Sequence, residues 1–120
     1  MTKTITNYVE VIGLFEDKEE FYRFVKSEDR LFDLNKIISL PKDERYNWSN
    51  YHNTHWGTKR NTWNCHLSKT SRRYRYWFDT ADSPPDLIYF RLVDLFPSLQ
   101  INWSYVEDGI VKQLKEPKYG

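Results

Sequence analysis

The pattern of polar and apolar side chains predicts a strand in each of three stretches of the chain. The stretches are residues 4–12, 72–80 and 99–106. All three are rich in β-branched and aromatic residues, which favour extended backbone. The middle stretch has the cleanest period of two, so its side chains divide between the two faces of a sheet. One face would carry Tyr74, Tyr76 and Phe78, and the other Arg73, Arg75 and Trp77.

Residues 16–27 have instead the spacing of an amphipathic helix. Phe21, Phe24 and Val25 fall on one side of such a helix and give it an apolar face. The first turn holds Glu16 and other acidic side chains, which suit the positive end of a helix dipole. The pattern therefore predicts a helix that lies with one face on the core.

A second helix is predicted to start at Ser83 and to run to about Phe96. Ser83 is expected to be the N-cap residue, with Pro84 at the first helical position and Asp86 at the capping-box position. A proline follows the predicted end, where a helix cannot continue. The residues expected to face inward are Ile88, Leu92, Leu95 and Phe96.

The region between these two halves has a weaker pattern. Residues 31–40 form an apolar run, of which we interpret the first part as irregular and the second as a short strand or sheet edge. Residues 42–58 are polar and aromatic, and a short helix is expected near residues 45–52. A strand is expected over 59–67 and a turn over 68–71.

The order is strand, helix, strand, insert, strand or strands, helix, strand. Two strand-helix-strand units in series predict an α+β fold of the ferredoxin-like, split βαβ type, with an antiparallel sheet and two helices on one face. With 120 residues the chain has the length of one domain. We expect a single domain over 1–112, an aromatic-rich insert at about 42–58 between its halves, a turn at Asp108-Gly109 and a flexible tail over 113–120.

Composition narrows the class of protein. Aromatic residues make up 18% of the chain, which argues for a folded domain although the mean hydropathy is −0.80. The one cysteine, Cys65, cannot form an internal disulfide. No stretch approaches the roughly 20 apolar residues that span a bilayer, and the N-terminus lacks the apolar core of a signal peptide. We expect a cytoplasmic protein of a bacterial cell, with no membrane partner.

The net charge of +1 hides an uneven distribution. Residues 46–78 hold six basic and no acidic side chains, whereas the rest of the chain holds 12 basic and 17 acidic ones. Bases stack on aromatic rings, and phosphates attract Arg and Lys. Because rings and cations are interleaved in residues 59–77, this segment is a candidate for binding nucleic acid. Its candidate contact residues are Lys69, Arg72, Arg73 and Arg75.

Five short motifs carry a family resemblance. They begin at Phe32 (FDLNKIISLP), Trp56 (WGTKRN), Phe78 (FDTADSPP), Phe96 (FPSL) and Tyr105 (YVEDG). In order and spacing they resemble the YubB-like ferredoxin-fold family, whose members are carried by plasmids, phages and other bacterial mobile elements. The resemblance covers roughly residues 32–109. It implies a ferredoxin-like core, no cofactor and no established activity.

Residue types of metal and thiol chemistry are present, but their spacing does not favour such sites. His52, His55, Cys65 and His66 are of the types that bind zinc. In a strand, however, Cys65 and His66 would point to opposite faces of the sheet. Cys65 can also be paired with a histidine as nucleophile and base, but no helix N-terminus follows it to activate the thiol.

Acid–base and phosphate chemistry find no better support. Asp79, Asp82 and Asp86 cluster near the start of the second predicted helix, where turn and first-turn roles explain them. The four glycines lie far apart and form neither a Walker A loop nor a Gly-x-Gly-x-x-Gly motif. We expect no cofactor, no metal and no enzymatic activity, and a small enzyme that uses Cys65 or a histidine is the least favoured hypothesis.

The insert is a candidate protein-binding segment. Trp, Tyr and Arg dominate binding hot spots, and the insert is too poor in aliphatic residues to build a core of its own. Trp56, beside Gly57, is expected to pack on the sheet and fix the insert in place, while other rings remain exposed. The candidate binding residues are Tyr46, Trp48, Tyr51, Trp56, Lys59 and Arg60.

These observations together predict a non-catalytic binding protein of a phage, plasmid or other bacterial mobile element. It would bind and modulate or inhibit a host protein or ribonucleoprotein, and a defence system inhibited in the anti-CRISPR manner is the sharpest version of this hypothesis. That version rests on the family resemblance and on the size of the chain. The alternative is a nucleic-acid-binding module that uses residues 59–77.

Overall fold

The computed structural model describes residues 3–39 and 48–115, and for residues 48–51 it describes the backbone only. Within these residues the chain forms five strands and four helices. In chain order they are β1 (Thr4–Ile12), α1 (Phe15–Val25), α2 (Leu34–Ile37), α3 (Trp48–Trp56), β2 (Trp63–Lys69), β3 (Arg73–Ala81), α4 (Asp86–Leu95), β4 (Gln100–Glu107) and β5 (Ile110–Gln113).

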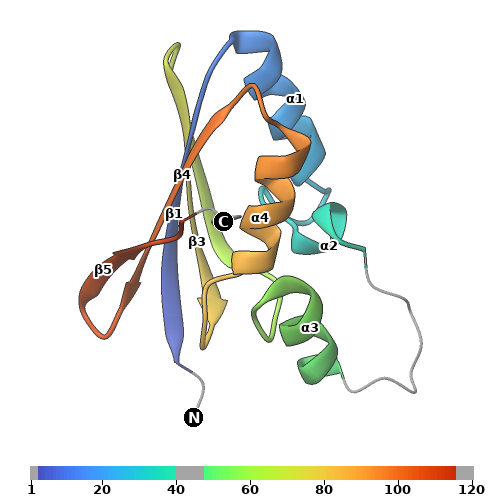
Figure 1. Cartoon of the computed structure of the whole chain (residues 1–120), viewed down its shortest axis with the longest axis vertical. Coiled ribbons are helices and arrows are strands. Elements are labelled where there is room, and N and C mark those ends of the chain that lie inside the picture. Colours follow the sequence, from blue (N-terminus) through green and yellow to red (C-terminus); the bar gives the residue numbers. More distant parts are fainter. Residues whose placement is uncertain (1–2, 40–47, 116–120) are drawn as a thin grey trace, which may run out of the picture.

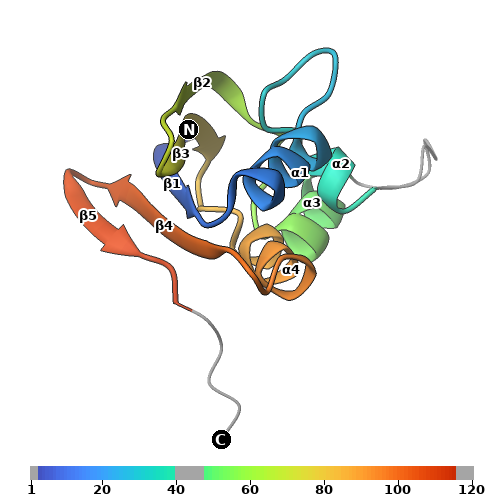
Figure 2. The same cartoon turned by 90° about the horizontal axis from the view of Figure 1, so that it is seen from above.

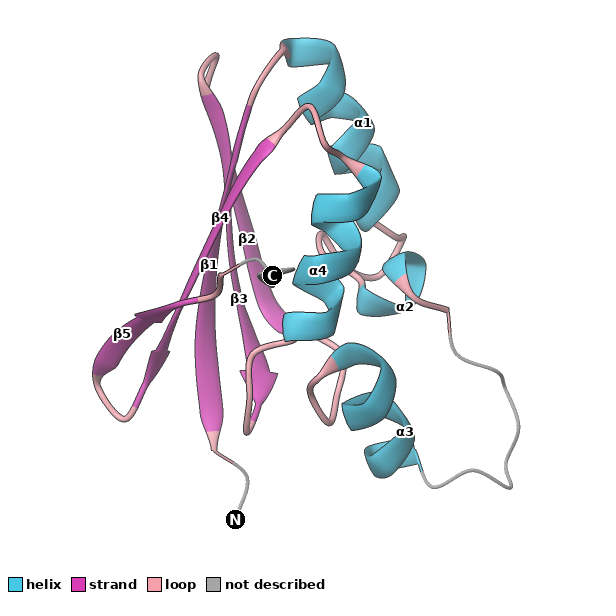
Figure 3. Ribbon diagram, in the orientation of Figure 1, coloured by secondary structure: helices cyan, strands magenta, loops and turns pink. Residues whose placement is uncertain are grey.

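The strands form one antiparallel sheet in the order β2-β3-β1-β4-β5. The central strand β1 pairs with β3 on one side and with β4 on the other. The helices α1 and α4 pack on one face of the sheet, and none of the described helices lies on the opposite face (Figure 1 and Figure 3). The predicted α+β class with an antiparallel sheet is confirmed.

Two of the predicted strands agree closely with the structure. β1 spans the predicted residues 4–12, and β3 is shifted by one residue from the predicted 72–80. Tyr74, Tyr76 and Phe78 are buried on the helix side of β3. The intervening side chains of β3 are only partly buried and lie on the uncovered side, as a period of two requires.

Aromatic rings fill the space between the sheet and the helices. Phe32 stacks on Phe78 with the ring centroids 4.6 Å apart, and it meets Trp103 edge-on at 5.7 Å. Phe21 of α1 contacts Tyr76 at 5.9 Å. Such ring pairs contribute about 0.5–1.5 kcal/mol each beyond the burial of their surface, so this cluster holds α1 and the residues before α2 against β3 and β4.

A chain of hydrogen bonds crosses the core beside these rings. Trp103 Nε1 donates to Asn7 Oδ1 at 3.1 Å, and Asn7 Nδ2 donates to Thr80 Oγ1 at 2.9 Å. Thr80 Oγ1 in turn donates to Ser83 O at 2.8 Å. Buried polar groups are tolerated only when they are paired, so Asn7 is accommodated in the central strand by its partners on β3 and β4.

The second half of the apolar run 31–40 is not the predicted strand or sheet edge. It contains the short helix α2, for which Asp33 is the N-cap residue because its side chain accepts from Asn35 N at 3.0 Å. Leu34 and Ile37 are buried. Residues three apart lie on the same side of a helix, and the Asp33 carboxylate stabilises the first turn as its cap.

The insert contains a helix, and it continues past the predicted end at residue 52. α3 covers residues 48–56, whereas residues 45–47 of the predicted helix lie outside the described residues. β2 begins at Trp63 instead of residue 59. The turn between β2 and β3 lies at residues 70–72. In Figure 1, α3 is found at the end of the sheet where β3 finishes and α4 begins.

The start of α4 differs from the predicted cap. Pro85 is the N-cap residue, and no side chain caps the helix. Pro85 disfavours helical backbone at Pro84, so the helix cannot start at Ser83. Ser83 Oγ donates instead to Gly57 O at 2.6 Å. Leu95, which was expected to face inward, is exposed, whereas Ile88 and Leu92 are buried as predicted.

The chain ends in a hairpin formed by β4 and β5. Asp108 and Gly109 form the predicted turn with φ values of 53° and 76°, the left-handed conformation that two-residue hairpin turns need. Gln113, expected to begin the tail, is the last residue of β5, and Leu114 N donates to Trp103 O at 2.8 Å. Figure 2 shows the hairpin extending away from the helices. Residues 116–120 lie outside the described residues.

Candidate interaction surface

The uncovered side of the sheet presents its side chains in rows that cross the strands. The central row consists of His66, Trp77, Tyr8 and Ser104. On one side of it lies the row of Trp63, Asp79, Thr6 and Val106. On the other side lie the rows of Ser68, Arg75, Glu10 and Asn102, and of Arg73, Ile12 and Gln100. We call the surface formed by these residues the open face.

Aromatic rings occupy the middle of the open face. Tyr8 and Trp77 contact each other with centroids 5.4 Å apart and ring planes tilted by 58°. Both side chains are half-buried, and Trp63 and His66 beside them are exposed. Exposed aromatic groups that lie together on one surface are typical of binding sites.

A carboxylate lies between two arginines next to these rings. Glu10 Oε2 is 2.8 Å from Arg73 Nη1 and 3.8 Å from Arg75 Nε, and Glu10 Oε1 accepts from Asn102 Nδ2 at 3.2 Å. Partial burial raises the pKa of Glu10, but the hydrogen bonds from Arg73 and Asn102 and the two positive charges outweigh it and leave the pKa lowered. Glu10 is therefore ionised at neutral pH.

The charges of the open face balance. Arg73 and Arg75 are matched by Glu10 and Asp79, and Asp79 accepts hydrogen bonds from Thr6 Oγ1 at 3.0 Å and from the nearby Asn64 at 3.3 Å. Arg75 Nε is buried and makes no hydrogen bond with the residues that the structure describes. The surface thus combines rings and arginines with no net charge.

The four residues of the predicted basic segment do not lie together. Lys69 is on the helix side, where its Nζ is 3.0 Å from Glu19 Oε2 and 3.5 Å from the centre of the Tyr22 ring. Arg72 is exposed in the turn between β2 and β3. Only Arg73 and Arg75 lie on the open face, because alternation along the strands sends neighbouring residues to opposite sides.

Trp56 of the insert is a core residue. It is only 3% exposed, its Nε1 donates to Ile38 O at 2.9 Å, and its ring stacks on His52 with centroids 4.4 Å apart. The prediction that Trp56 fixes the insert against the body of the domain agrees with this placement. Its burial also means that the ring is not offered to a partner, contrary to its place among the candidate binding residues.

The other candidate residues of the insert have separate surroundings. Lys59 is exposed and forms an ion pair with Asp82, whereas Arg60 is exposed in the loop before β2. Tyr46 lies outside the described residues, and so do the side chains of Trp48 and Tyr51. The structure therefore assigns no contact to these three rings.

Two of the sequence motifs pack on each other. Thr58 Oγ1 donates to Ala81 O at 2.8 Å, and Ser83 Oγ donates to Gly57 O at 2.6 Å. Gly57 has a φ of 86°, and a Cβ at this position would lie 2.0 Å from Asp86 Oδ1. Glycine is required here by backbone conformation and by close approach, so the Trp-Gly-Thr-Lys and Ser-Pro-Pro motifs have a shared structural role.

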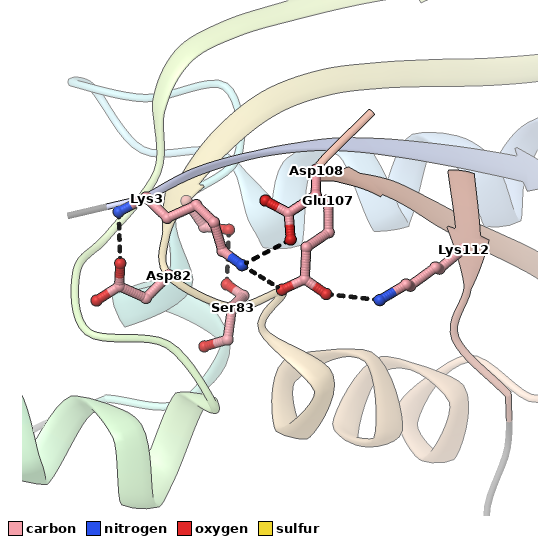
Figure 4. Close-up of polar contacts among 7 residues, drawn as sticks. Lys3, Asp82, Ser83, Glu107, Asp108 and Lys112 are labelled. Carbon is pink, nitrogen blue, oxygen red and sulfur yellow. Dashed lines mark hydrogen bonds and ion pairs between the residues drawn. The ribbon is translucent and has the colours of Figure 1, made fainter. Parts of the chain in front are cut away.

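Ion pairs at the same end of the sheet tie the terminal strands together (Figure 4). Lys3 N donates to Asp82 Oδ1 at 2.6 Å, and Lys3 Nζ lies 3.0 Å from Glu107 Oε2 and 3.4 Å from Asp108 Oδ2. Lys112 Nζ is 2.8 Å from Glu107 Oε1. Hydrogen bonds from Lys112 and Lys3 lower the pKa of Glu107. This network fastens β1 to β3 and to the β4–β5 hairpin.

Cys65 and His66 point to opposite sides of β2, as predicted. The Cys65 thiol packs against the core and donates to Thr62 Oγ1 at 3.3 Å, whereas His66 lies on the open face beside Asn64. Over the described parts of the chain, no three His, Cys, Asp or Glu side chains are grouped so that they could hold a metal ion.

Two hollows lie near the loop that follows α1. The larger has a volume of about 650 Å³ and is lined by residues that include Tyr22, Lys26, Glu28 and Lys36. The smaller, of about 440 Å³, lies between Arg30 and the start of β2. Charged side chains of both signs line the larger hollow, so its chemistry does not define a ligand.

Comparisons of the chain with protein-family models, with curated proteins and with solved structures found no match. Among the described residues, no helix is both long and apolar enough to cross a membrane.

Tyr8 and Glu10 are two functional candidates of this surface that the sequence analysis did not single out. Their signal lies in the strand at residues 4–12. There Tyr8 and Glu10 are on the same face of the strand as Thr6, and the buried Val9 and Val11 are on the other face. The two faces of that strand can be assigned only once its neighbours in the sheet are known, because both faces carry large side chains.

Proposed function

We propose that this protein binds another protein through the open face of its sheet and carries out no catalysis. The observation that carries the proposal is the Tyr8–Trp77 pair, left without a covering helix in the centre of the sheet. Arg75 and Arg73 lie in the next two rows on one side of it. Tyr, Trp and Arg are the residue types that contribute most to binding hot spots.

The charge of the open face favours a protein partner over nucleic acid. A surface that binds single strands combines rings with a basic groove, whereas here the ionised Glu10 lies between the two arginines. Lys69 and Arg72, which a basic segment would add, lie elsewhere. Binding of nucleic acid by residues 59–77 remains the alternative that the experiment below separates.

The proposal includes a ferredoxin-like fold and membership of the YubB-like family. With β5 set aside, the sheet order is β2-β3-β1-β4, which fits the split βαβ arrangement. In the chain α1, followed by the short helices α2 and α3, connects β1 to β2, and α4 connects β3 to β4. The packing of Gly57 and Thr58 against Ala81 and Ser83 gives two of the resembling motifs a common place. The partner would then be a bacterial host protein or complex, such as a defence system, met in the cytoplasm by a protein of a mobile element.

The test is affinity capture from bacterial lysate with three forms of the tagged protein, each with and without nuclease. The forms are the wild type, a Tyr8→Ala/Trp77→Ala variant and a Leu14→Ala/Phe15→Ala variant, which removes exposed apolar side chains from the start of α1. Urea unfolding confirms that each variant is folded.

We expect that the wild type captures a partner protein and that nuclease treatment does not release it. The Leu14→Ala/Phe15→Ala control should capture the same protein, and the Tyr8→Ala/Trp77→Ala variant should not. Equal retention by both variants would contradict the assignment of the open face. Loss of all captured material on nuclease treatment would favour the nucleic-acid alternative.

A further inference from the structure

The two edges of the sheet are protected to different degrees. At the β2 edge the register with β3 is interrupted between Trp63 and His66, and Asn64 there has a φ of 56°. An irregularity of this kind bends an edge strand and deters another strand from pairing with it. At the β5 edge the register with β4 is continuous over all four residues of the strand.

The β5 edge is also apolar and exposed. Ile110 is 60% and Val111 is 71% exposed, and Val106, which lies directly opposite Val111 on β4, is exposed as well. Natural proteins blunt free edges with charges, prolines or bulges. The only charged residue of β5 is Lys112, and Glu107 neutralises it at 2.8 Å.

We propose that a second copy of this chain occupies the β5 edge, so that the two β5 strands pair antiparallel about a two-fold axis. Residues directly opposite each other in an antiparallel pair share a face. When two copies of a strand pair about a two-fold axis normal to the sheet, one residue must therefore lie at the axis, directly opposite the same residue of the other copy. For β5 the two central choices are Val111 and Lys112.

Charge selects the pairing centred on Val111. Centring on Lys112 would place two ammonium groups opposite each other, which is destabilising. Centring on Val111 extends the pair of Val106 and Val111 into a row of four valines, two from each copy. In this register Ile110 lies opposite Lys112 of the second copy and can pack on the alkyl part of its side chain.

The proposed contact is small, so the dimer is weak. A standard stable interface buries about 800 Å² on each partner, which is more than a strand of four residues supplies by itself. The fraction of dimer should therefore rise steadily with protein concentration. Of the residues that define the open face the contact uses only Val106, at the rim, and not Tyr8 or Trp77. It therefore does not depend on the proposed function, and it would join the open faces of both copies into one surface.

Sedimentation velocity at protein concentrations from micromolar to millimolar tests the proposal on three forms of the full chain. The wild type should shift from monomer towards dimer, and Val111→Lys, a change at an exposed side chain, should remain monomeric. Ser68→Lys puts the same charge at the β2 edge and should dimerise like the wild type. A wild type that stays monomeric throughout, or a dimer that Val111→Lys leaves intact, would overturn the proposal.

Disulfide trapping tests the register. In a Cys65→Ser background, Val111→Cys should form a disulfide-linked dimer under mild oxidation, because the two side chains are opposite each other. Ile110→Cys should cross-link far more slowly, since the two cysteines would be offset along the strands. Equal or faster cross-linking by Ile110→Cys would contradict the pairing centred on Val111.

Discussion

Tyr8 of β1 and Trp77 of β3 are directly opposite each other in the sheet, and their rings touch with centroids 5.4 Å apart. The helices α1 and α4 cover the other side of the same strands. A contact between large rings thus lies where the fold does not need it for its core. Both side chains are only half-buried, so each ring keeps part of its surface free for a partner.

The first prediction concerns the energy of this contact. In a double-mutant cycle of Tyr8→Ala and Trp77→Ala, the double variant should lose less unfolding free energy than the sum of the two single losses. The difference should be about 0.5–1.5 kcal/mol. Urea unfolding of the four proteins measures the coupling. Trp77→Ala combined with Phe15→Ala, a distant exposed residue, should be additive. Additivity in both cycles would contradict the Tyr8–Trp77 contact.

The second prediction concerns the buried polar chain. Asn7→Ala removes the acceptor of Trp103 Nε1 and the donor to Thr80 Oγ1. A buried group left without its partner costs about 1–3 kcal/mol, and the unfolding free energy should fall by that amount. Thr4→Ala, on an exposed side chain of the same strand, should change it by no more than about 0.5 kcal/mol. Similar values for both variants would show that Asn7 is not held as described.

The third prediction compares two glycines with positive φ. Gly109→Ala has free space around the new Cβ and should cost only the backbone term, about 1–2 kcal/mol. Gly57→Ala adds a clash with Asp86, whose Oδ1 would lie 2.0 Å away, and should cost more. Thermal unfolding ranks the two variants. Adding Asp86→Ala to Gly57→Ala should recover part of the difference, and no recovery would count against the clash.

The fourth prediction is a pH dependence at the network of Figure 4. Lys112 and Lys3 hold the pKa of Glu107 below its ordinary value of 4.5. A lowered pKa contributes stability above the pKa of the unfolded chain, and this contribution is lost as the pH falls through the folded value. When the pH is lowered below about 4.5, the urea midpoint of the wild type should therefore decrease more steeply than that of Glu107→Gln.

Salt provides the control for that measurement. The residues of the network are partly exposed, so added salt should screen their attraction and bring the two pH curves together. Curves that run parallel at low salt would show that Glu107 does not contribute through its charge.

The strands could be predicted from the sequence where one of their faces is buried. In β3 the buried Tyr74, Tyr76 and Phe78 alternate with side chains of the open face, and this period is visible in the chain itself. The short strand β5 has no such signal, since all four of its residues are exposed. Only its pairing with β4 defines it.

The local structure around α2 could not be fully predicted because, besides its local cap by Asp33, it depends on a residue that is distant in the sequence. Leu34 N donates to Asn61 Oδ1 at 2.9 Å, and Asn61 Nδ2 donates to Asp33 Oδ1 at 2.7 Å. Asn61 is too far along the chain to enter a pattern read around residues 31–40. The cap of this helix therefore depends on the loop before β2, which the sequence pattern does not bring near.

The basic segment shows a similar limit for the candidate site. Lys69 and Arg75 are close in sequence, but the turn at residues 70–72 and the alternation of β2 and β3 place them on opposite sides of the sheet. A sum of charges along the chain therefore overstates the charge of any one surface. The aromatic residues of the open face come from β1, β2 and β3, and only the sheet order brings them together.

Site-specific photocross-linking tests the central claim most directly. A photoreactive phenylalanine replaces either His66, which is exposed on the open face, or Arg91, which is exposed on α4. Both forms are irradiated in bacterial lysate. The account predicts that one protein is cross-linked from position 66 and not from position 91. Equal cross-linking of that protein from both positions, or cross-linking only to nucleic acid from position 66, would contradict it.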